Sequence, residues 1–300
     1  MHSGPCRTRA ARLACGSPII QAGVPMASRA SAVPSASLPA MGTLLREWRG
    51  ARRMSQLALA LEAGTSSRHL SCVETGKSRA SRELACRLAD VLGMPLRERN
   101  ALLLAGGYAP QYPERALAAP ALEPMRQAIG LIVAHQEPYP AFVIDRHWNV
   151  LMANDAAARV NGLLMDGRES RHGNLLHQVF DPRDFRPVIV NWPEVAEKFI
   201  RHVQAQLAAA PTDDGLRALL AEVLAYPDVP EHWRSRDPAS APAPVLTLQF
   251  RSRLGELRFF ETITTFSMPR DVTLDELRIE CAFPADEQTA AICAGLAAST

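Results

Sequence analysis

The chain has 300 residues, 47% of them hydrophobic, and its formal net charge is only +2. This length indicates two domains plus tails, since single cores usually span about 100–200 residues. The six cysteines form no Cys-x-x-Cys pair, which argues against zinc sites and against a disulfide scaffold. The sequence contains no run of about 18 apolar residues, the length that a transmembrane helix needs. The cysteine content fits a reducing cytoplasm.

The small net charge hides an uneven distribution of charge along the chain. Residues 41–110 hold eleven Lys or Arg against six Asp or Glu, and residues 1–40 hold four Arg and no acid. The rest of the chain therefore carries a net charge of −7. A basic DNA-binding head followed by an acidic second domain would produce this asymmetry.

Residues 1–40 are rich in Ala, Ser, Pro, Gly and Arg and show no apolar periodicity. This composition predicts a disordered N-terminal arm, whose arginines could touch a phosphate backbone. Two alternatives remain open: the segment resembles a transit peptide in composition, or the start codon was chosen too far upstream.

Residues 55–74 have the pattern of two short helices joined by a glycine turn. Ser55 is placed to cap a first helix over about residues 56–63. The inner face of this helix is predicted to hold Leu57, Ala60 and Leu61. Gly64 follows where a turn needs a positive φ, and a second helix runs over about residues 66–74.

The second helix carries short polar side chains on its outer face. In a helix-turn-helix protein this helix lies in the major groove, where arginine can bind guanine and serine several base edges. The predicted base-reading residues are Ser66, Ser67, Arg68 and Ser71. The predicted phosphate contacts are Gln56, Lys77 and Arg79.

An ordinary helical hairpin in a bundle would show the same two-helix pattern. Three flanking features favour DNA binding instead. A helix over residues 41–53 separates apolar residues from arginines, a polar turn over residues 74–79 carries two cations, and Ser81 caps a further helix over residues 82–92.

Residues 41–106 resemble the five-helix DNA-binding domain of XRE-type, phage-repressor-like regulators. The matching features are the start Ser55-Gln56, the pair Ala60 and Gly64, and the ending Val73-Glu74-Thr75-Gly76-Lys77. The resemblance implies an all-α, lambda-repressor-like domain over residues 41–107 whose fifth helix spans residues 95–106. It also implies binding of double-stranded DNA, and paired half-sites would suit a homodimer.

A proline-rich linker is predicted over residues 108–121 and a second domain over residues 122–300. The second domain is predicted to begin with a helix over residues 123–135 and two short strands within residues 140–154. Asn154 would cap the next helix. The later elements are predicted as a mostly helical stretch over residues 180–224, strands over 245–251, 257–266 and 277–283, and a C-terminal helix capped by Asp286.

Residues 122–284 resemble the ligand-binding domain of MmyB-like regulators. The matching phrases begin at Glu137, Trp148 and Asp271. They read Glu-Pro-Tyr-Pro-Ala-Phe-Val-Ile-Asp, Trp-Asn-Val-Leu-Met-Ala-Asn and Asp-Val-Thr-Leu-Asp-Glu-Leu-Arg. The resemblance implies an α+β, PAS-like domain with an antiparallel sheet, and a pocket for a fatty-acid-like molecule.

Large side chains of this domain either line a cavity or fill its core. The candidate ligand contacts are Trp148, Asn154, Phe180, Trp192, Phe199, Phe259 and Phe266. For each aromatic residue, plain core packing is the competing interpretation, and for Asn154 it is helix capping. Arg258 and Arg278 could pair with a carboxylate or lie on solvated strand faces.

An enzymatic second domain is not favoured. His172 and His177 are five residues apart, with Asp181 and Asp184 nearby, but this spacing does not place two imidazoles on one helix face. We find no nucleophile elbow and no phosphate-binding loop. The sequence predicts no catalytic residues, no metal and no cofactor.

The sequence therefore predicts a cytoplasmic, nucleoid-associated transcriptional regulator that binds a small apolar ligand and no membrane. One alternative is a DNA-binding regulator whose second domain serves only dimerisation. An enzyme with a DNA-binding head is the least favoured interpretation.

Overall fold

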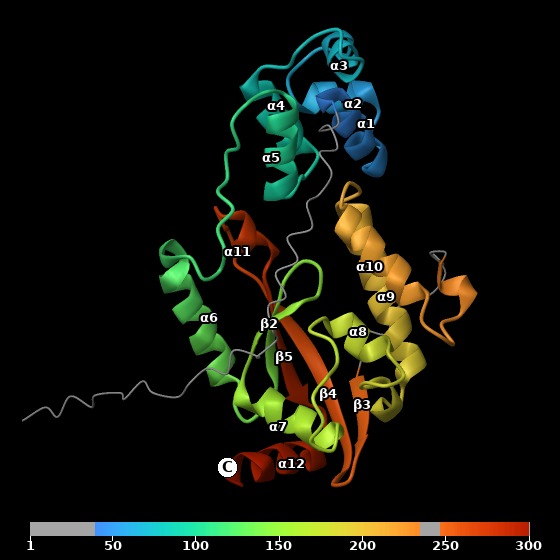
Figure 1. The fold of residues 1–300 in the computed structure, drawn as a ribbon. Helices are drawn as coiled ribbons and strands as arrows, with labels where there is room; N and C mark the ends of the chain where they lie inside the picture. Colours follow the sequence, from blue (N-terminus) through green and yellow to red (C-terminus); the bar gives the residue numbers. More distant parts are fainter. Residues whose placement is uncertain (1–39, 235–246, 300) are drawn as a thin grey trace, which may run out of the picture.

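The computed structural model describes residues 40–234 and 247–299. Figure 1 shows a helical head above a larger domain built on a sheet. Of the predicted N-terminal arm, all but Ala40 lies outside the described residues.

Residues 41–105 form the helical head. Its helices are α1 (Met41–Ala51), α2 (Gln56–Glu62), α3 (Ser67–Glu74), α4 (Arg82–Val91) and α5 (Leu96–Ala105). Ser55 caps α2 by accepting a hydrogen bond from the backbone N–H of Ala58, and Ser81 caps α4 in the same way. Gly64, with φ of 65°, makes the turn between α2 and α3. These caps and this turn confirm the predicted helix-turn-helix.

The predicted inner face of α2 was right for Ala60 but wrong for Leu57 and Leu61. Leu57 and Leu61 are 59% and 70% exposed, whereas Leu59 and Ala60 are buried. Leucine and alanine alternate along this helix. Either Leu59 or the pair Leu57 and Leu61 could therefore face the core beside Ala60, and periodicity does not decide between them. Leu59 and Ala60 both belong to the hydrophobic core of the head.

The second domain is organised around an antiparallel five-stranded sheet in the order β2-β1-β5-β4-β3. The strands are β1 (Ala141–Ile144), β2 (Val150–Ala153), β3 (Thr247–Ser252), β4 (Gly255–Thr264) and β5 (Arg278–Pro284). The last strand in sequence therefore lies at the centre, paired with β1 on one side and β4 on the other.

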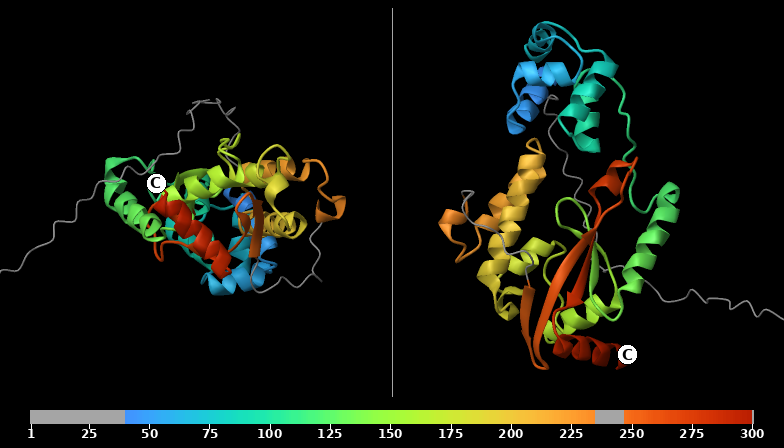
Figure 2. Two further views of the ribbon diagram at one scale, coloured as in Figure 1. Left: turned by 90° about the horizontal axis from the view of Figure 1, so that it is seen from below. Right: turned by 180° about the vertical axis from the view of Figure 1, so that it is seen from behind.

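Alternation along the strands gives the sheet two different apolar faces. One face, which includes Val143 and Ile279, packs against α6 (Glu123–His135) through Ile129 and Val133. The opposite face, which includes Leu248, packs against the other helices. These helices are α7 (Asp155–Leu164), α8 (Leu175–Phe180), α9 (Trp192–Ala209) and α10 (Asp214–Leu224). Figure 2 shows the sheet between α6 and this group.

Shorter elements complete the domain. Helix α12 (Glu287–Ala298), capped by Asp286 as predicted, lies against α7 and β4. Helix α11 (Val272–Glu276) connects β4 to β5 and contacts α5 of the head, and the sequence analysis missed it. Within the described residues, short 3-10 turns span Pro120–Leu122, Arg186–Val188 and Glu231–Arg234.

Polar contacts join the head to the second domain. Arg97 of α5 binds Glu276 of α11 at 2.6 Å and Glu114 of the linker at 2.6 Å. The backbone N–H of Leu96 donates to Asp275, at 3.2 Å. The first turn of α5 is therefore fastened to the segment that leads into the central strand.

Candidate nucleic-acid interface and ligand pocket

The start of α3 presents the predicted base-reading residues to solvent. Ser66, Ser67 and Arg68 are exposed, and Ser71 is half-buried. Ser66 is the N-cap, and its hydroxyl accepts a hydrogen bond from the backbone N–H of His69 at 3.1 Å. Because a hydroxyl can also donate, this cap leaves Ser66 able to contact a nucleic acid.

A buried carboxylate holds α1, α2 and α3 together beneath this surface. Glu74 is only 2% exposed and accepts two hydrogen bonds from Arg49, at 2.7 and 3.0 Å. Gln56 donates to the same carboxylate at 2.7 Å. Burial opposes ionisation of Glu74, but the bonds from Arg49 and Gln56 outweigh it and lower the pKa of the carboxyl. The amide of Gln56 thus positions α2 within the head.

The two predicted phosphate-binding cations beyond α3 differ in their surroundings. Both Lys77 and Arg79 are exposed. Arg79, however, donates to the carbonyl of Gly106 and lies over the ring of Tyr108, with its Cζ 4.8 Å from the ring centroid. Its guanidinium therefore also ties the turn after α3 to the end of α5.

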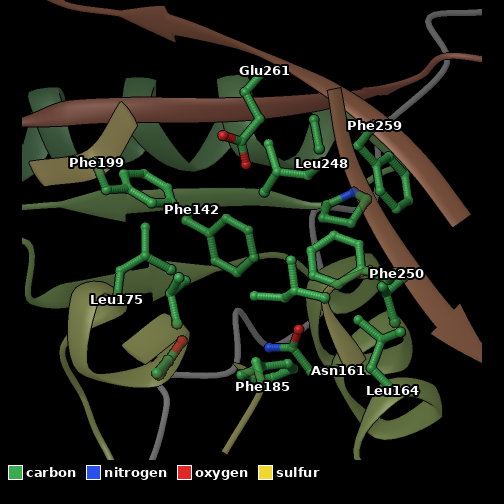
Figure 3. A pocket seen from close by; sticks show the side chains of 16 residues that line it. Phe142, Asn161, Leu164, Leu175, Phe185, Phe199, Leu248, Phe250, Phe259 and Glu261 are labelled. Atoms are coloured by element: carbon green, nitrogen blue, oxygen red, sulfur yellow. The ribbon is translucent and has the colours of Figure 1, made fainter. Parts of the chain in front are cut away.

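An apolar pocket lies between the sheet and helices α7, α8 and α9. It spans about 650 Å³ of space between the atoms, part of which is open solvent. Figure 3 shows aromatic and aliphatic side chains around it. The side chains that line it include Phe142, Leu164, Phe185, Phe199, Leu248 and Phe259.

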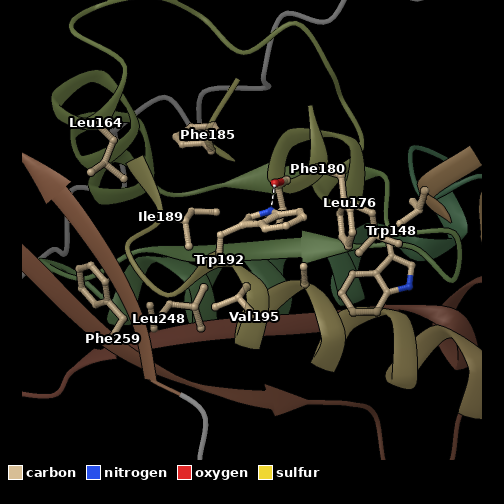
Figure 4. Close-up of a cluster of buried hydrophobic side chains, with 14 of the residues drawn as sticks. Trp148, Leu164, Leu176, Phe180, Phe185, Ile189, Trp192, Val195, Leu248 and Phe259 are labelled. Carbon is tan, nitrogen blue, oxygen red and sulfur yellow. Dashed lines mark hydrogen bonds between the residues drawn. The ribbon is translucent and has the colours of Figure 1, made fainter. Parts of the chain in front are cut away.

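Two of the predicted ligand contacts, Phe199 and Phe259, line this pocket. Trp148, Phe180 and Trp192 instead belong to the packed core beside it, shown in Figure 4. Trp148 donates to Gln206 at 2.9 Å, and Trp192 donates to the carbonyl of Val179 at 2.9 Å. These bonds hold the indoles as parts of the core.

The other two predicted ligand contacts lie away from the apolar pocket. Phe266 packs with the cluster on the opposite face of the sheet, where α6 lies. Asn154 caps α7, and its side-chain oxygen accepts from the backbone N–H groups of Ala141 and Ala157. Its amide donates to two backbone carbonyls. Helix capping thus explains Asn154 fully, although it also borders a second depression.

That second depression opens beside the apolar pocket and encloses about 1550 Å³, also partly open to solvent. It shares four side chains with the pocket, among them Phe142 and Phe185, so the two spaces adjoin. The loop over residues 167–173 lines it with Arg168, Arg171 and His172. The space therefore changes from apolar at the sheet to polar at this loop.

Sequence reasoning missed two glutamates on the pocket side of the sheet. Glu261 lines the apolar pocket, and Glu280 is 3% exposed on the central strand. Burial raises the pKa of Glu261 to about 7. Burial, and next the charge of Glu261, raises the pKa of Glu280 to about 8. The signal that could have revealed this pair is an acid that continues the apolar side of an alternating strand, as Glu261 does after Leu257 and Phe259.

The histidines that suggested a metal site belong to a hydrogen-bonded network. His172 contacts Asp181 at 2.8 Å, and His177 contacts the hydroxyl of Tyr226 at 3.0 Å. Arg183, through its hydrogen bonds, holds the pKa of Asp181 well below its usual range. Within the described residues, no group of three or more His, Cys, Asp or Glu side chains is arranged to hold a metal ion.

Among the helices in the described part of the chain, none combines the length and the apolar character needed to span a bilayer.

Comparison with solved structures gives little further guidance. A search of curated proteins found no match. One similar solved chain is described as the structure of an RNA-binding light-oxygen-voltage receptor, with 14% identity and a TM-score of 0.24. The alignment covers 87% of this chain and 64% of that one.

Two family comparisons agree with both domains. Residues 40–102 match a helix-turn-helix domain family. Residues 125–296, more than half of the chain, match the MmyB-like transcription regulator ligand binding domain. The first match contains α1 to α4 and most of α5, and the second contains the whole sheet and its pocket. The chain belongs to the family of MmyB-like transcription regulators, with a DNA-binding helix-turn-helix domain ahead of its ligand-binding domain.

Proposed function

We propose that this regulator reads operator DNA as a homodimer, through α3, and that a small, mainly apolar ligand in the second domain controls its DNA affinity. The mostly apolar lining of the pocket suits a fatty-acid-like chain. The protein would act in the cytoplasm, at the nucleoid, without catalysis, cofactor or membrane attachment.

One observation carries the DNA-binding proposal. The exposed side chains of Ser66, Ser67 and Arg68 stand together at the N-terminal end of α3, whose other face is fixed by Leu70 and Val73 in the head core. A recognition helix reads base edges with residues near its N-terminus. Ser71, Gln56, Lys77 and Arg79 complete the proposed DNA-contact set.

The first prediction concerns Arg68 as a base reader. Arg68→Ala should lose about 1–3 kcal/mol on the preferred operator and less on other sequences, because arginine forms a bidentate pair with guanine. Selection of bound DNA from a random pool, followed by titration of the selected site, measures both affinities.

Lys77→Ala is the matched control for Arg68→Ala, because it removes a cation from an exposed turn beyond the helix. This variant should weaken binding to all sequences alike and reduce the salt slope by about one unit. If Arg68→Ala weakened binding equally on every sequence, Arg68 would be a phosphate contact rather than a base reader.

The apolar pocket supports ligand control. Its wall combines β1, β3 and β4 of the sheet with α7, α8 and α9, so a bound molecule would touch most elements of the domain. A ligand shifts an equilibrium only by its different affinity for two arrangements. Native mass spectrometry of freshly purified protein, with DNA titrations before and after ligand removal, tests this proposal.

The alternative is a second domain that only dimerises. It predicts a mass without bound ligand, and a DNA affinity that added acyl compounds leave unchanged. Retention of a lipid-sized mass together with a change in DNA affinity on its removal would exclude that alternative.

A further inference from the structure

Two arginines of the loop over residues 167–173 border the depression that adjoins the apolar pocket. Arg168 and Arg171 both line this depression, and both are exposed. The Nε atom of Arg168 donates to the carbonyl of Met165 at 3.2 Å, and its other guanidinium nitrogens have no partner among the described residues. Within the same part of the chain, the guanidinium of Arg171 makes no hydrogen bond and no ion pair. The loop therefore offers unused N–H donors of two cations to the depression.

The backbone that carries these arginines is held in place from beneath. Asp184 is 2% exposed and accepts from the hydroxyl of Ser170 at 2.7 Å and from the backbone N–H of Arg171 at 2.9 Å. Gln178 donates to the carbonyl of His172 at 2.7 Å. Asp184 lines neither cavity, so its carboxylate does not meet a molecule bound there. Because the loop backbone is fixed in advance, mainly the arginine side chains remain to be ordered on binding.

Asn161 of α7 lies where the two cavities meet, since it lines both of them. Its side chain is half-buried, and its amide has no hydrogen-bond partner among the described residues. Figure 3 shows this amide among the apolar side chains of the pocket. An amide offers two N–H donors and one acceptor. Asn161 can therefore bind the polar group of a molecule that extends from the apolar pocket into the depression.

The sheet end of the apolar pocket disfavours a charged group. Among the described residues that line this pocket, Glu261 is the only one with an ionisable side chain. Burial raises the pKa of its carboxyl to about 7, which shows how strongly this environment opposes charge. A molecule with an apolar chain and one charged end would therefore place the chain at the sheet and the charge at the loop.

We propose that Asn161, Arg168 and Arg171 form a head-group site that binds the anionic end, a carboxylate or a phosphate, of an amphiphile whose alkyl chain fills the apolar pocket. This inference rests on the proposed ligand-binding function and defines the polar end of the ligand. Guanidinium groups bind both anions through paired hydrogen bonds. The depression is also lined by Glu169, so its two arginines meet one carboxylate. An ammonium group would meet two like charges there.

The test compares four probes that share a ten-carbon chain and differ at the polar end. Decanoate, decyl phosphate, 1-decanol and decylamine are titrated calorimetrically into the full chain at pH 7.5, below their aggregation limits. We expect at least one of the two anions to bind about tenfold more tightly than decanol, and decylamine to bind more weakly than decanol. The anion that binds more tightly identifies the head group.

Variants locate the preference for an anion. Arg168→Gln and Arg171→Gln should each reduce the advantage of the anions over decanol about threefold, and the double variant should remove it. Asn161→Asp places a negative charge at the junction and should weaken binding of the anions about tenfold. Arg217→Gln is the matched control, because Arg217 is an exposed arginine of α10 that pairs with Asp214 and lines neither cavity. It should leave the order of the probes unchanged.

Arg278 is the rival cation for an anionic group. Its Nη1 atom is buried without a hydrogen-bond partner within the described residues, but Arg278 lines neither cavity. Salt distinguishes the two places, because exposed charges are screened at high ionic strength and buried ones much less. We expect the advantage of the anions over decanol to fall about threefold between about 0.05 M and about 0.5 M sodium chloride. An advantage that salt leaves unchanged and Arg278→Gln removes would overturn the loop site.

The outcomes separate this inference from the function on which it rests. If decanol binds and neither anion has an advantage, or if that advantage survives the double arginine variant, the head-group site is excluded and ligand binding stands. Tighter binding of decylamine than of decanol would also exclude an anionic head group. If none of the four probes binds, both the head-group site and the alkyl-chain pocket are overturned.

Discussion

Glu280 illustrates how one buried acid ties the stability of the domain to pH. Its pKa is raised to about 8, mainly by burial, whereas an unfolded glutamate titrates near about 4.3. The folded state therefore binds more protons than the unfolded state between these values. The free energy of unfolding therefore falls as pH rises through this window, because the carboxyl ionises more readily in the unfolded chain than in the folded one.

Glu280→Gln should remove most of this pH dependence. Between pH 5 and pH 9 we expect the wild type to lose about 4 kcal/mol more unfolding free energy than the variant. Urea unfolding of both proteins at several pH values measures the difference. Equal pH profiles would show that Glu280 titrates normally in the folded protein.

At the residue scale, the sequence predicted helix caps better than ligand contacts. Ser55, Ser81 and Asp286 cap the helices that they were expected to cap, because capping depends on local spacing. Whether Trp192 fills the core or lines the pocket depends on how helices from distant parts of the chain meet. Glu261 was missed because an acid on a strand is usually solvated.

At the scale of elements, the contact between α1 and α3 depends on one glycine. A Cβ atom on Gly42 would lie 2.4 Å from the carbonyl oxygen of Glu74 and 2.6 Å from that of Val73. Both are backbone atoms at the end of α3, so the two helices would have to separate.

Gly42→Ala should therefore destabilise the head by about 1–3 kcal/mol, as overpacking does elsewhere. Gly50→Ala on the same helix is the control, because, apart from its chain neighbours and the nearby backbone of its own helix, no atom of the described residues lies within 4 Å of the place that its Cβ atom would take. That change should be neutral or slightly stabilising. Thermal melting followed by circular dichroism compares the two variants, and equal melting temperatures would contradict the close packing of α1 on α3.

The types of the elements and their order could largely be predicted from the sequence. The side of a helix that faces the core, and the short helices within connections, could not. The hairpin of β1 and β2 and the helix over Glu123–His135 follow from local patterns. Helix α11 has only five residues, too few for periodicity to reveal. The orientation of α2 depends on which leucine packs in the head core, and that is determined by contacts with the other helices.

At the scale of the whole molecule, the docking of head on sensor depends on a few partly buried ion pairs. Arg97 is the centre of this contact because it binds both Glu276 of α11 and Glu114 of the linker. Thr212, before α10, donates to Glu98 in the same region at 2.7 Å. A head held by such contacts can be released without disturbing its own core.

Arg97→Ala should loosen this docking. Amide hydrogen exchange in α11 and in residues 106–119 should become several-fold faster, because local opening then needs less free energy. Arg99→Ala is the control, because Arg99 pairs with Asp90 inside the head. Similar exchange in both variants would show that the Arg97 contact does not hold the domains together.

The central position of β5 also has a consequence for synthesis of the protein. The hairpin of β1 and β2 and the hairpin of β3 and β4 are joined only through residues 278–284 within the described sheet. A nascent chain can complete its helical head, whose contacts are local, well before these residues leave the ribosome. Until residues 278–284 emerge, we expect the apolar faces of the two hairpins to stay exposed and to be bound by chaperones. A chain released before residue 278 would carry a DNA-binding head that no ligand can control.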